Sequence, residues 1–470
     1  MSSVTTSRTA ISQAEPRPLW NSDARQVVID STPPPLRTDI AIIGAGYTGL
    51  WTALYLKTLN SSLDITVLEK HAIGFGASGR NGGWCSALLP TSLSSIADIH
   101  GHQVAKTMRQ CAVDNLFEMK QALDQHSIHC DYALGGTLTV ARNRPQVQRL
   151  AHLAKEETSF GATDSDIALL DKTEVDSRIK VTDTHAALFT PNCAALHPRK
   201  LVNGLALACL QMGVSLVEGI DVVSYTSGSV NTRHNGQQTD LRCDWVVRAT
   251  EGYSSNFRQA RRELIPLYSF MVATEPLSPS VWSDLRWHER ETLNDVRNGV
   301  VYAQRTADGR IVFGGRGAPY HFASRIHDSQ DIDDVVHGSL VSTLHEFFPA
   351  TRDVAITHRW GGPLGVPRDW RNFARVDHEK RLAVGGGYTG DGVALAHLTG
   401  RMLAHGVLQY DHPSLALPWF GHRGRSWEPE PLRWAAVNAL RKIVDSMDAT
   451  ESRRNKPARL RQLMVGRFLR

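Results

Sequence analysis

The stretch Ile40-Ala41-Ile42-Ile43-Gly44-Ala45-Gly46-Tyr47-Thr48-Gly49 decides the fold of this 470-residue chain. Its first four residues form an apolar run, which predicts a buried strand of a parallel sheet. The glycines that follow have the G-x-G-x-x-G spacing. Further along, apolar residues recur at helical spacing, namely Leu50, Ala53, Leu54 and Leu59. The order predicts a strand, a glycine-rich turn and a helix.

A second predicted strand, Asp64-Ile65-Thr66-Val67-Leu68, ends at Glu69. This acid stands about 25 residues after Gly44, where dinucleotide-binding folds place the group that binds ribose hydroxyls. Gly44 would allow a tight exit from the strand, and Gly46 would let backbone N–H groups approach a pyrophosphate. Gly49 would let the helix lie close to the sheet. The alternative is a glycine turn with a purely structural role.

Two further glycine segments favour FAD over NAD. Gly74-Phe75-Gly76-Ala77-Ser78-Gly79-Arg80-Asn81-Gly82-Gly83 follows the acid-bearing strand and offers side-chain donors that a simple NAD fold does not need. Gly385-Gly386-Gly387-Tyr388-Thr389-Gly390-Asp391-Gly392 follows an apolar run and precedes a predicted helix. The N-terminus of that helix would stabilise an anionic reduced flavin. A plain strand–helix turn is the alternative.

With these segments in place, the chain resembles the D-amino-acid-oxidase-like (DAO) superfamily of FAD-dependent amine oxidoreductases, on the side of the gamma-glutamylputrescine oxidase-like branch. The resemblance spans most of the chain. Besides the glycine segments it rests on His197-Pro198-Arg199-Lys200-Leu201-Val202, Asp308-Gly309-Arg310-Ile311, Gly314-Gly315-Arg316-Gly317 and Trp427-Glu428-Pro429-Glu430-Pro431-Leu432-Arg433-Trp434.

The motifs and the resemblance together imply a set of cofactor contacts. Val222 and Val223 would bring backbone groups to the adenine, and the predicted strand Trp245-Val246-Val247-Arg248-Ala249-Thr250 would end beside the cofactor. The expected FAD-binding residues are Gly44, Ala45, Gly46, Tyr47, Thr48, Gly49, Glu69, Lys70, Gly76, Ala77, Ser78, Arg80, Asn81, Gly82, Gly83, Val222, Ala249, Thr250, Gly387, Gly390, Gly392 and Val393.

The resemblance implies oxidation of a C–N bond in an amine or amino acid. Hydride passes from the carbon next to nitrogen to flavin N5, the imine hydrolyses in water, and O2 or another acceptor reoxidises the flavin. Two alternatives stay open: a flavin-dependent monooxygenase, and a flavin-binding module without catalysis. The substrate is open among gamma-glutamyl polyamines, N-alkyl glycines, D-amino acids and aminophosphonates.

No certain catalytic residue follows from the sequence, but four residues are candidates for the substrate pocket. Arg316 stands among glycines, where its guanidinium would reach a ligand carboxylate; the alternative is a structural salt bridge. Tyr268, Tyr302 and Trp360 are the aromatic candidates, with ordinary sheet positions as the alternative for the two tyrosines.

Two departures from the family bear on the flavin. Some members attach FAD through a histidine equivalent to Arg80-Asn81 or through a cysteine in the C-terminal third, and this chain has neither, since its last cysteine is Cys243. We therefore expect non-covalent FAD. Asp391 stands where relatives often carry histidine, and we expect it to cap the following helix and point away from the flavin, because a carboxylate there would oppose the reduced anion.

The expected fold is α/β (α+β): a Rossmann-like FAD-binding domain, an interleaved antiparallel-sheet substrate domain and a C-terminal helical tail. We expect a mobile arm over 1–36 and a discontinuous FAD domain from 37–90, 191–264 and 360–415. The substrate domain would comprise 91–190 and 265–359, and the helical extension 416–470.

The remaining composition argues against metal-binding, disulfide-rich, membrane-spanning and nucleic-acid-binding proteins. Six scattered cysteines and dispersed histidines favour neither metal nor disulfides. No membrane-length apolar run or signal-peptide core is found, so we expect a cytoplasmic location and no membrane span. The net charge of +5 is modest, and we expect no nucleic-acid partner. The oligomeric state is open.

The C-terminal residues 451–470 are basic. One interpretation is that they dock on a nucleic acid or another acidic surface. We expect instead two amphipathic helices whose apolar stripes pack on the body, leaving a solvated basic face. The stripes are Leu432, Ala436, Leu440, Ile443 and Met447, and then Leu460, Leu463, Met464 and Phe468.

Overall fold

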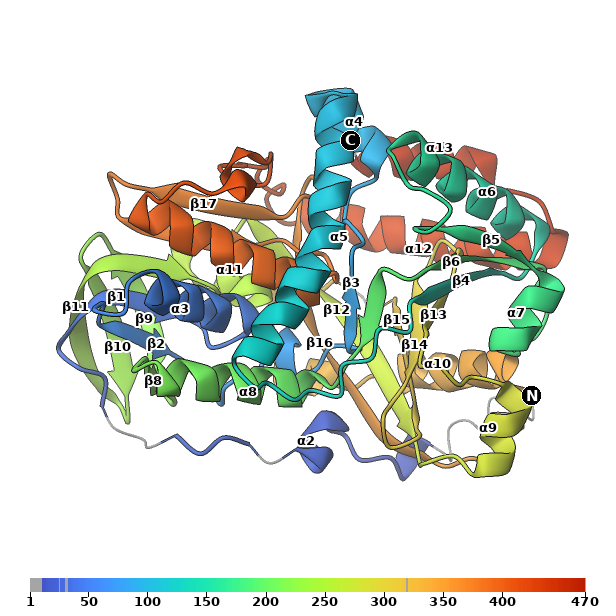
Figure 1. The fold of residues 1–470 in the computed structure, drawn as a ribbon, viewed down its shortest axis with the longest axis horizontal. Coiled ribbons are helices and arrows are strands. Elements are labelled where there is room, and N and C mark those ends of the chain that lie inside the picture. Colours follow the sequence, from blue (N-terminus) through green and yellow to red (C-terminus); the bar gives the residue numbers. More distant parts are fainter. Residues whose placement is uncertain (1–10, 25, 30–32, 318–319, 470) are drawn as a thin grey trace.

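The protein is built on two large sheets that lie side by side, each with its own helices (Figure 1). It is described from a computed structural model that covers residues 11–24, 26–29, 33–317 and 320–469. The mixed α/β architecture agrees with the predicted fold class.

The first sheet is parallel at its centre. Its order is β17-β18-β11-β1-β2-β8, and a hairpin of β9 and β10 extends β11. Ile43 lies opposite both Leu68 and Arg248, so the strands that carry the first glycine turn and Glu69 end at the same edge. The strands are β1 (Arg37–Ile43), β2 (Ile65–Leu68), β8 (Ser215–Val217), β9 (Asp221–Thr226), β10 (Ser229–His234), β11 (Gln237–Arg248), β17 (Phe373–Asp377) and β18 (Leu382–Gly386).

Helices cover one face of this sheet, and the hairpin of β9 and β10 helps to cover the other. The helices are α3 (Tyr47–Leu59), α4 (Leu93–His100), α5 (His102–Gln125), α8 (Pro198–Gln211) and α11 (Gly392–Leu408). The helices α3 and α11 pack closely, because a Cβ on Gly400 would lie 2.6 Å from the Cβ of Trp51. The predicted strand–turn–helix order from Ile40 onward is therefore found in the structure.

The second sheet is mostly antiparallel, as predicted for 265–359. Its one parallel pair joins β13 to β4, which comes from the earlier segment. In spatial order its strands are β16 (Ile356–Pro367), β12 (Leu264–Thr274), β15 (Ile311–Arg316), β14 (Val301–Arg305), β13 (Thr292–Asp295), β4 (Thr137–Ala141), β6 (Ala186–Thr190) and β5 (Ala168–Asp171). Its helices are α6 (Arg144–Ser159), α7 (Lys172–Arg178), α9 (Pro279–Leu285) and α10 (Asp334–Phe347), and a small sheet of β3 (Trp84–Ser86) and β7 (Cys193–Ala195) completes the strands.

The N-terminal segment differs from the expected mobile arm. Residues 11–24, which include α2 (Trp20–Asp23), run along the lower edge of the molecule in Figure 1. Leu19 and Trp20 are fully buried in a cluster with Trp360 and Met271. We call residues 11–24 the N-terminal strap.

The C-terminal helices are α12 (Leu432–Arg454) and α13 (Arg459–Leu469). On α12, Val437 and Met447 are buried, but Leu432 is exposed. On α13, the predicted packing is wrong: Leu460, Leu463 and Met464 are 79%, 66% and 56% exposed. The side chain of Phe468 lies outside the described part of the structure.

Candidate functional site

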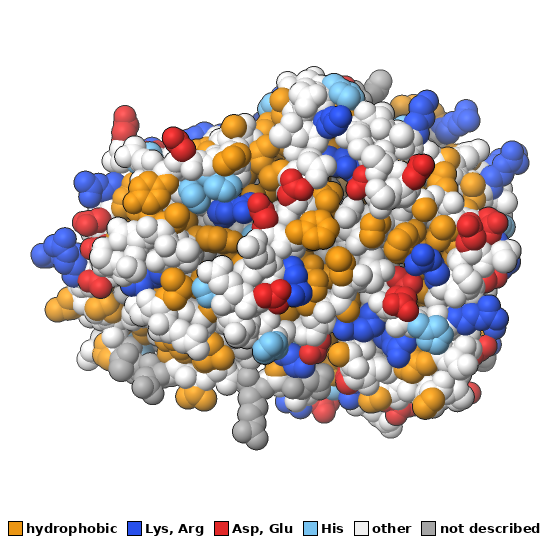
Figure 2. Space-filling view, viewed as in Figure 1, with side chains coloured by type: hydrophobic (Ala, Val, Ile, Leu, Met, Phe, Trp, Pro, Cys, Tyr) orange, Lys and Arg blue, Asp and Glu red, His pale blue; other side chains and the backbone are white. Residues whose placement is uncertain are grey.

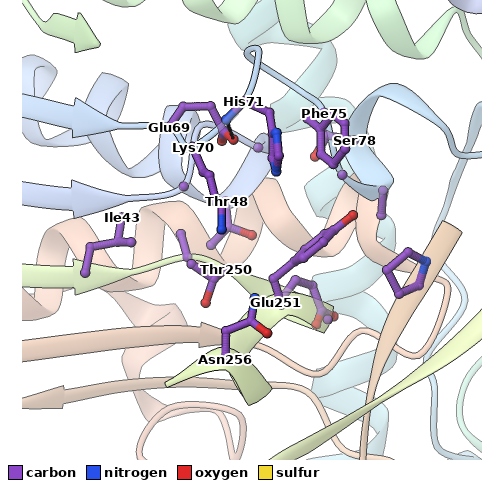
Figure 3. A pocket seen from close by; sticks show the side chains of 18 of the residues that line it. Ile43, Thr48, Glu69, Lys70, His71, Phe75, Ser78, Thr250, Glu251 and Asn256 are labelled. Atoms are coloured by element: carbon purple, nitrogen blue, oxygen red, sulfur yellow. Dashed lines mark hydrogen bonds between the residues drawn. The ribbon is translucent and has the colours of Figure 1, made fainter. Parts of the chain in front are cut away.

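A cavity of about 570 Å³ opens where β1, β2 and β11 end, and all three glycine segments reach it. Figure 3 shows Glu69, Lys70 and His71 on one side of it and Thr250, Glu251 and Asn256 on the other. The predicted residues that line it are Gly44, Gly46, Tyr47, Thr48, Glu69, Lys70, Gly76, Ala77, Ser78, Asn81, Val222, Ala249, Thr250, Gly390, Gly392 and Val393.

The first residues of two helices line this cavity. The first is α3, whose N-cap residue, Gly46, supplies no side-chain hydrogen bond, although Ser78 Oγ accepts one from Tyr47 N. The second is α11, which begins at Gly392 and also has no side-chain N-cap hydrogen bond. Helix N-termini carry unpaired N–H donors and a partial positive charge. The cavity is therefore suited to an anion such as a diphosphate.

The turn before α3 requires glycine. Gly44 has φ +103°, and a Cβ on it would lie 2.7 Å from the carbonyl oxygen of Ala249. A Cβ on Gly46 would lie 2.9 Å from Ser78 Oγ, which accepts a hydrogen bond from Tyr47 N at 2.9 Å. The first and second glycine segments thus touch, and side chains at these positions would fill the turn.

Carboxylates define the opposite side of the cavity. Glu69 Oε2 accepts a hydrogen bond from Ala45 N at 2.9 Å, and Oε1 accepts one from His71 N at 3.0 Å. Enclosure by protein raises the pKa of Glu69, against the lowering effect of these hydrogen bonds. Nearby, Asp221 pairs with Lys70 at 3.1 Å and with Arg233. Carboxylate oxygens accept hydroxyl protons, so this side suits ribose.

Glu251 is a lining residue that the sequence analysis missed. Its Oε1 accepts hydrogen bonds from Tyr388 N at 3.0 Å and Gly387 N at 3.2 Å. Its Oε2 is buried and has no hydrogen-bond partner among the described residues. Burial raises the pKa of Glu251 to about 7, although the two amide hydrogen bonds lower it. Its position directly after the strand-end pair Ala249-Thr250 was the available signal.

The donor set fits FAD. The N-termini of α3 and α11 offer N–H groups for a diphosphate, and Glu69 offers acceptors for hydroxyls. Lining residues outside the predicted set include His71, Phe75, Asp221, Arg233, Tyr253, Asn256, Asp328 and Tyr388. Several of these have no motif of their own, since the fold brings them in from neighbouring loops.

Six predicted cofactor residues do not line the cavity: Ala45, Gly49, Arg80, Gly82, Gly83 and Gly387. Gly49 packs α3 on the turn, since a Cβ there would lie 2.0 Å from Gly44 O. The sequence predicts that Arg80 donates to the flavin, but its side chain does not line the cavity. Its guanidinium pairs with Asp331, donates to Phe75 O at 2.8 Å and lies over the Phe75 ring.

The predicted substrate-pocket residues are not brought to this cavity. Trp360 is buried and donates its Nε1–H to Arg80 O at 2.8 Å, so it supports the second glycine segment from behind. Tyr268 is buried and donates to Gln330 Oε1 at 3.1 Å. Neither residue lines the cavity, since strand alternation does not say which face of the sheet meets the cofactor domain.

Tyr302 and Arg316 differ from that pair. The Tyr302 ring lies against Gly82, where an added Cβ would be 2.6 Å from its Cε2, and its hydroxyl is 3.0 Å from Ser269 Oγ. It therefore borders the second glycine segment. Arg316 ends β15 opposite Ser269, and its side chain lies outside the described part of the structure.

Asp391 is at the N-cap position of α11, but its side chain makes no capping hydrogen bond, contrary to the expectation. It is not among the lining residues, whereas its neighbours Gly390 and Gly392 are. The carboxylate contributes to raising the pKa of Cys193 to about 11, after the larger effect of burial.

Other site classes find no support in the described ranges. No group of three or more His, Cys, Asp or Glu side chains is arranged to hold a metal ion there. Within the same ranges, no helix combines the length and apolarity needed to cross a membrane. The six cysteines are free thiols, and none lines the cavity.

Comparison with known proteins gives a family match and several relatives that agree with one another. The sequence model of the family described as FAD dependent oxidoreductase (DAO) matches residues 39–405. A gamma-glutamylputrescine oxidoreductase of Escherichia coli is 29% identical over 373 residues, covering 78% of this chain and 82% of the relative. A probable oxidoreductase, OrdL, of Haemophilus influenzae is 28% identical over 389 residues, covering 80% and 85%.

Among solved structures, glycine oxidase from Geobacillus kaustophilus superposes with a TM-score of 0.69 at 19% identity. The match covers 83% of this chain and 100% of that one, and it shows a shared fold.

Proposed function

The chain belongs to the DAO family of FAD-dependent oxidoreductases, and from that premise we propose that it oxidises a carbon–nitrogen bond in a small amine or amino acid. The proposed products are the reduced flavin and an imine, which hydrolyses in water. O2 or another acceptor then reoxidises the flavin.

One observation carries the proposal. Three glycine segments, at 44–49, 74–83 and 385–392, line a single cavity together with the N-termini of α3 and α11. In a chain of this family, such a cavity is suited to holding FAD at the edge between the two sheets. The E. coli relative is named for gamma-glutamylputrescine, which makes that compound the first substrate to try.

The chain's own groups have distinct proposed tasks. The N–H groups at the start of α3 would bind the diphosphate, and Glu69 would orient a ribose through its hydroxyls. Glu251 would hold the third glycine segment beside the cofactor, since its Oε1 accepts hydrogen bonds from the Gly387 and Tyr388 amides. When bound, FAD supplies the hydride acceptor, so the remaining work is to orient the amine and exclude water.

The test is anaerobic reduction of the FAD-loaded protein, followed by its absorbance. The panel contains gamma-glutamylputrescine, N-alkyl glycines, D-amino acids, aminophosphonates and NAD(P)H. Bleaching by an amine or amino acid supports the proposal. Bleaching by NAD(P)H alone would favour a monooxygenase, and no reduction by any compound would favour a non-catalytic flavin module.

We also propose that FAD is held without a covalent bond, because no cysteine lines the cavity. Acid precipitation should release the yellow chromophore into the supernatant. A chromophore that stays with the pellet would contradict this and point to His71, the histidine among the lining residues.

A further inference from the structure

The C-terminal helix α13 presents its polar side to the protein and its apolar side to water. Arg461 donates from Nη1 to Ser446 O at 3.0 Å and to Thr450 Oγ1 at 2.7 Å, and both acceptors lie on α12. Gln462 donates to Glu451 Oε1 of the same helix at 3.3 Å. The helix is therefore held on α12 by polar contacts.

The apolar residues of α13 are left uncovered. Leu460, Leu463 and Met464 are 79%, 66% and 56% exposed, and their i, i+3, i+4 spacing puts them on one helix face. A surface helix of a globular protein ordinarily turns such a face to the core. Exposed apolar residues that adjoin each other in this way mark an interaction site.

The surroundings of this face are strongly basic. Arg453, Arg454, Lys456 and Arg459 are exposed and have no ion pair among the residues the structure describes. Figure 2 shows Lys and Arg side chains gathered at the upper right, where Figure 1 places α13. The face thus combines uncovered apolar groups with unneutralised positive charge.

The single acidic residue of 451–470 does not offset this charge. Glu451 is 1% exposed, and its two oxygens accept hydrogen bonds from Arg149 Nη1 and Nη2 at 3.0 and 2.7 Å. Its carboxylate is thus already paired inside the protein. Any partner of the face must bring negative charge of its own.

We propose that α13 docks this protein on the surface of an anionic phospholipid bilayer. A short helix with apolar residues on one face and arginine and lysine beside them can lie in the headgroup region. Basic residues close to such a surface each strengthen binding about fivefold. A second copy of the chain is a poorer occupant, because two such faces would repel each other.

The test is co-sedimentation of the full-length protein with vesicles of phosphatidylcholine containing about 30 mol% phosphatidylserine. The wild-type protein should bind these vesicles, bind pure phosphatidylcholine at least tenfold more weakly, and be released at about 1 M salt. The double variant Leu463→Glu/Met464→Glu should lose at least tenfold in binding. Val335→Glu, which changes a 72% exposed residue on α10, is the matched control and should bind like wild type.

Two results would overturn the proposal. One is that the wild-type protein does not bind anionic vesicles at low salt, or that the double variant binds them as well as the wild-type protein does. The other is a wild-type dimer in light scattering that the double variant converts to monomer, which would assign the face to a second copy. Flavin reduction by substrate is measured separately and does not enter either outcome.

Discussion

Glu251 occupies a strained position in the wall of the cavity. Its backbone has φ +41°, in the left-handed region that residues other than glycine rarely adopt. A Cβ on Gly365 would lie 1.8 Å from its Oε2, so the side chain fits only because Gly365 has none. The left-handed backbone of Glu251 and the missing side chain of Gly365 together hold this carboxyl group in the wall of the cavity.

The ionisation of Glu251 should make stability depend on pH in protein freed of FAD. Burial raises its pKa to about 7 from an ordinary 4.5, so the folded state holds this proton more tightly than the unfolded state. The stabilisation is full below pH 4.5 and is lost as the pH rises toward 7, by about 3 kcal/mol. Glu251→Gln should remove this part of the slope in denaturant titrations between those pH values. A slope as steep as wild type would contradict the assignment, and Glu379→Gln, at an exposed turn, is the control.

Among the elements, the N-terminal strap has the least expected role. Trp20 donates its Nε1–H to the carbonyl oxygen of Asn81 at 2.9 Å, within the second glycine segment. Asn21 Oδ1 accepts hydrogen bonds from Arg199 Nε and Nη2, and Arg199 Nη1 donates to Ile73 O at 2.6 Å. The strap thus supports the loop that lines the cavity, although it lies outside the matched family region.

Trp20→Phe should weaken FAD binding about fivefold. The change keeps an aromatic ring next to His197 and Trp360 but removes the donor to Asn81 O, and one hydrogen bond contributes about 1 kcal/mol. Fluorescence titration of the FAD-free protein with FAD measures the dissociation constant. Trp434→Phe, at a 43% exposed tryptophan on α12, should leave it unchanged. Equal affinities for all three proteins would show that the strap does not act on the loop.

At the scale of the whole molecule, the two sheets meet around the second glycine segment. Gln304 of β14 donates to Gly82 O at 2.7 Å, and Trp360 of β16 donates to Arg80 O. Arg80 itself pairs with Asp331 on the far side of the junction, with both side chains less than one-fifth exposed. Burial raises the pKa of Asp331 even though Arg80 lowers it. The cavity is therefore bordered by a loop that both halves hold in place.

Breaking the Arg80–Asp331 pair should destabilise the protein by about 3 kcal/mol, because either single change leaves a buried charge without its partner. We expect Asp331→Asn and Arg80→Met each to lower the free energy of unfolding, and the double variant to lose less than their sum. The exposed pair Lys120–Asp124 on α5 is the control, with little coupling expected. Additive effects at Arg80 and Asp331 would mean that the two side chains do not act as a pair.

The nucleotide-binding half was largely predictable from the sequence. Each of its signals is local: Gly44 is required by its φ, Glu69 follows its strand by a fixed spacing, and Ile40-Ala41-Ile42-Ile43 is apolar because both faces are covered. Such requirements are met within one turn or one strand, so they leave a pattern in consecutive residues.

The sequence by itself therefore determined the DAO-type fold, the FAD requirement and the three glycine segments that reach the cavity. The tertiary structure alone decided that Trp360 and Tyr268 turn to the core, that Glu251 lines the cavity and that the apolar side of α13 is exposed to solvent. The reason is physical: which face a strand or helix buries depends on the neighbours that the completed fold provides. A period of two or 3.6 residues marks a face without saying what lies opposite it.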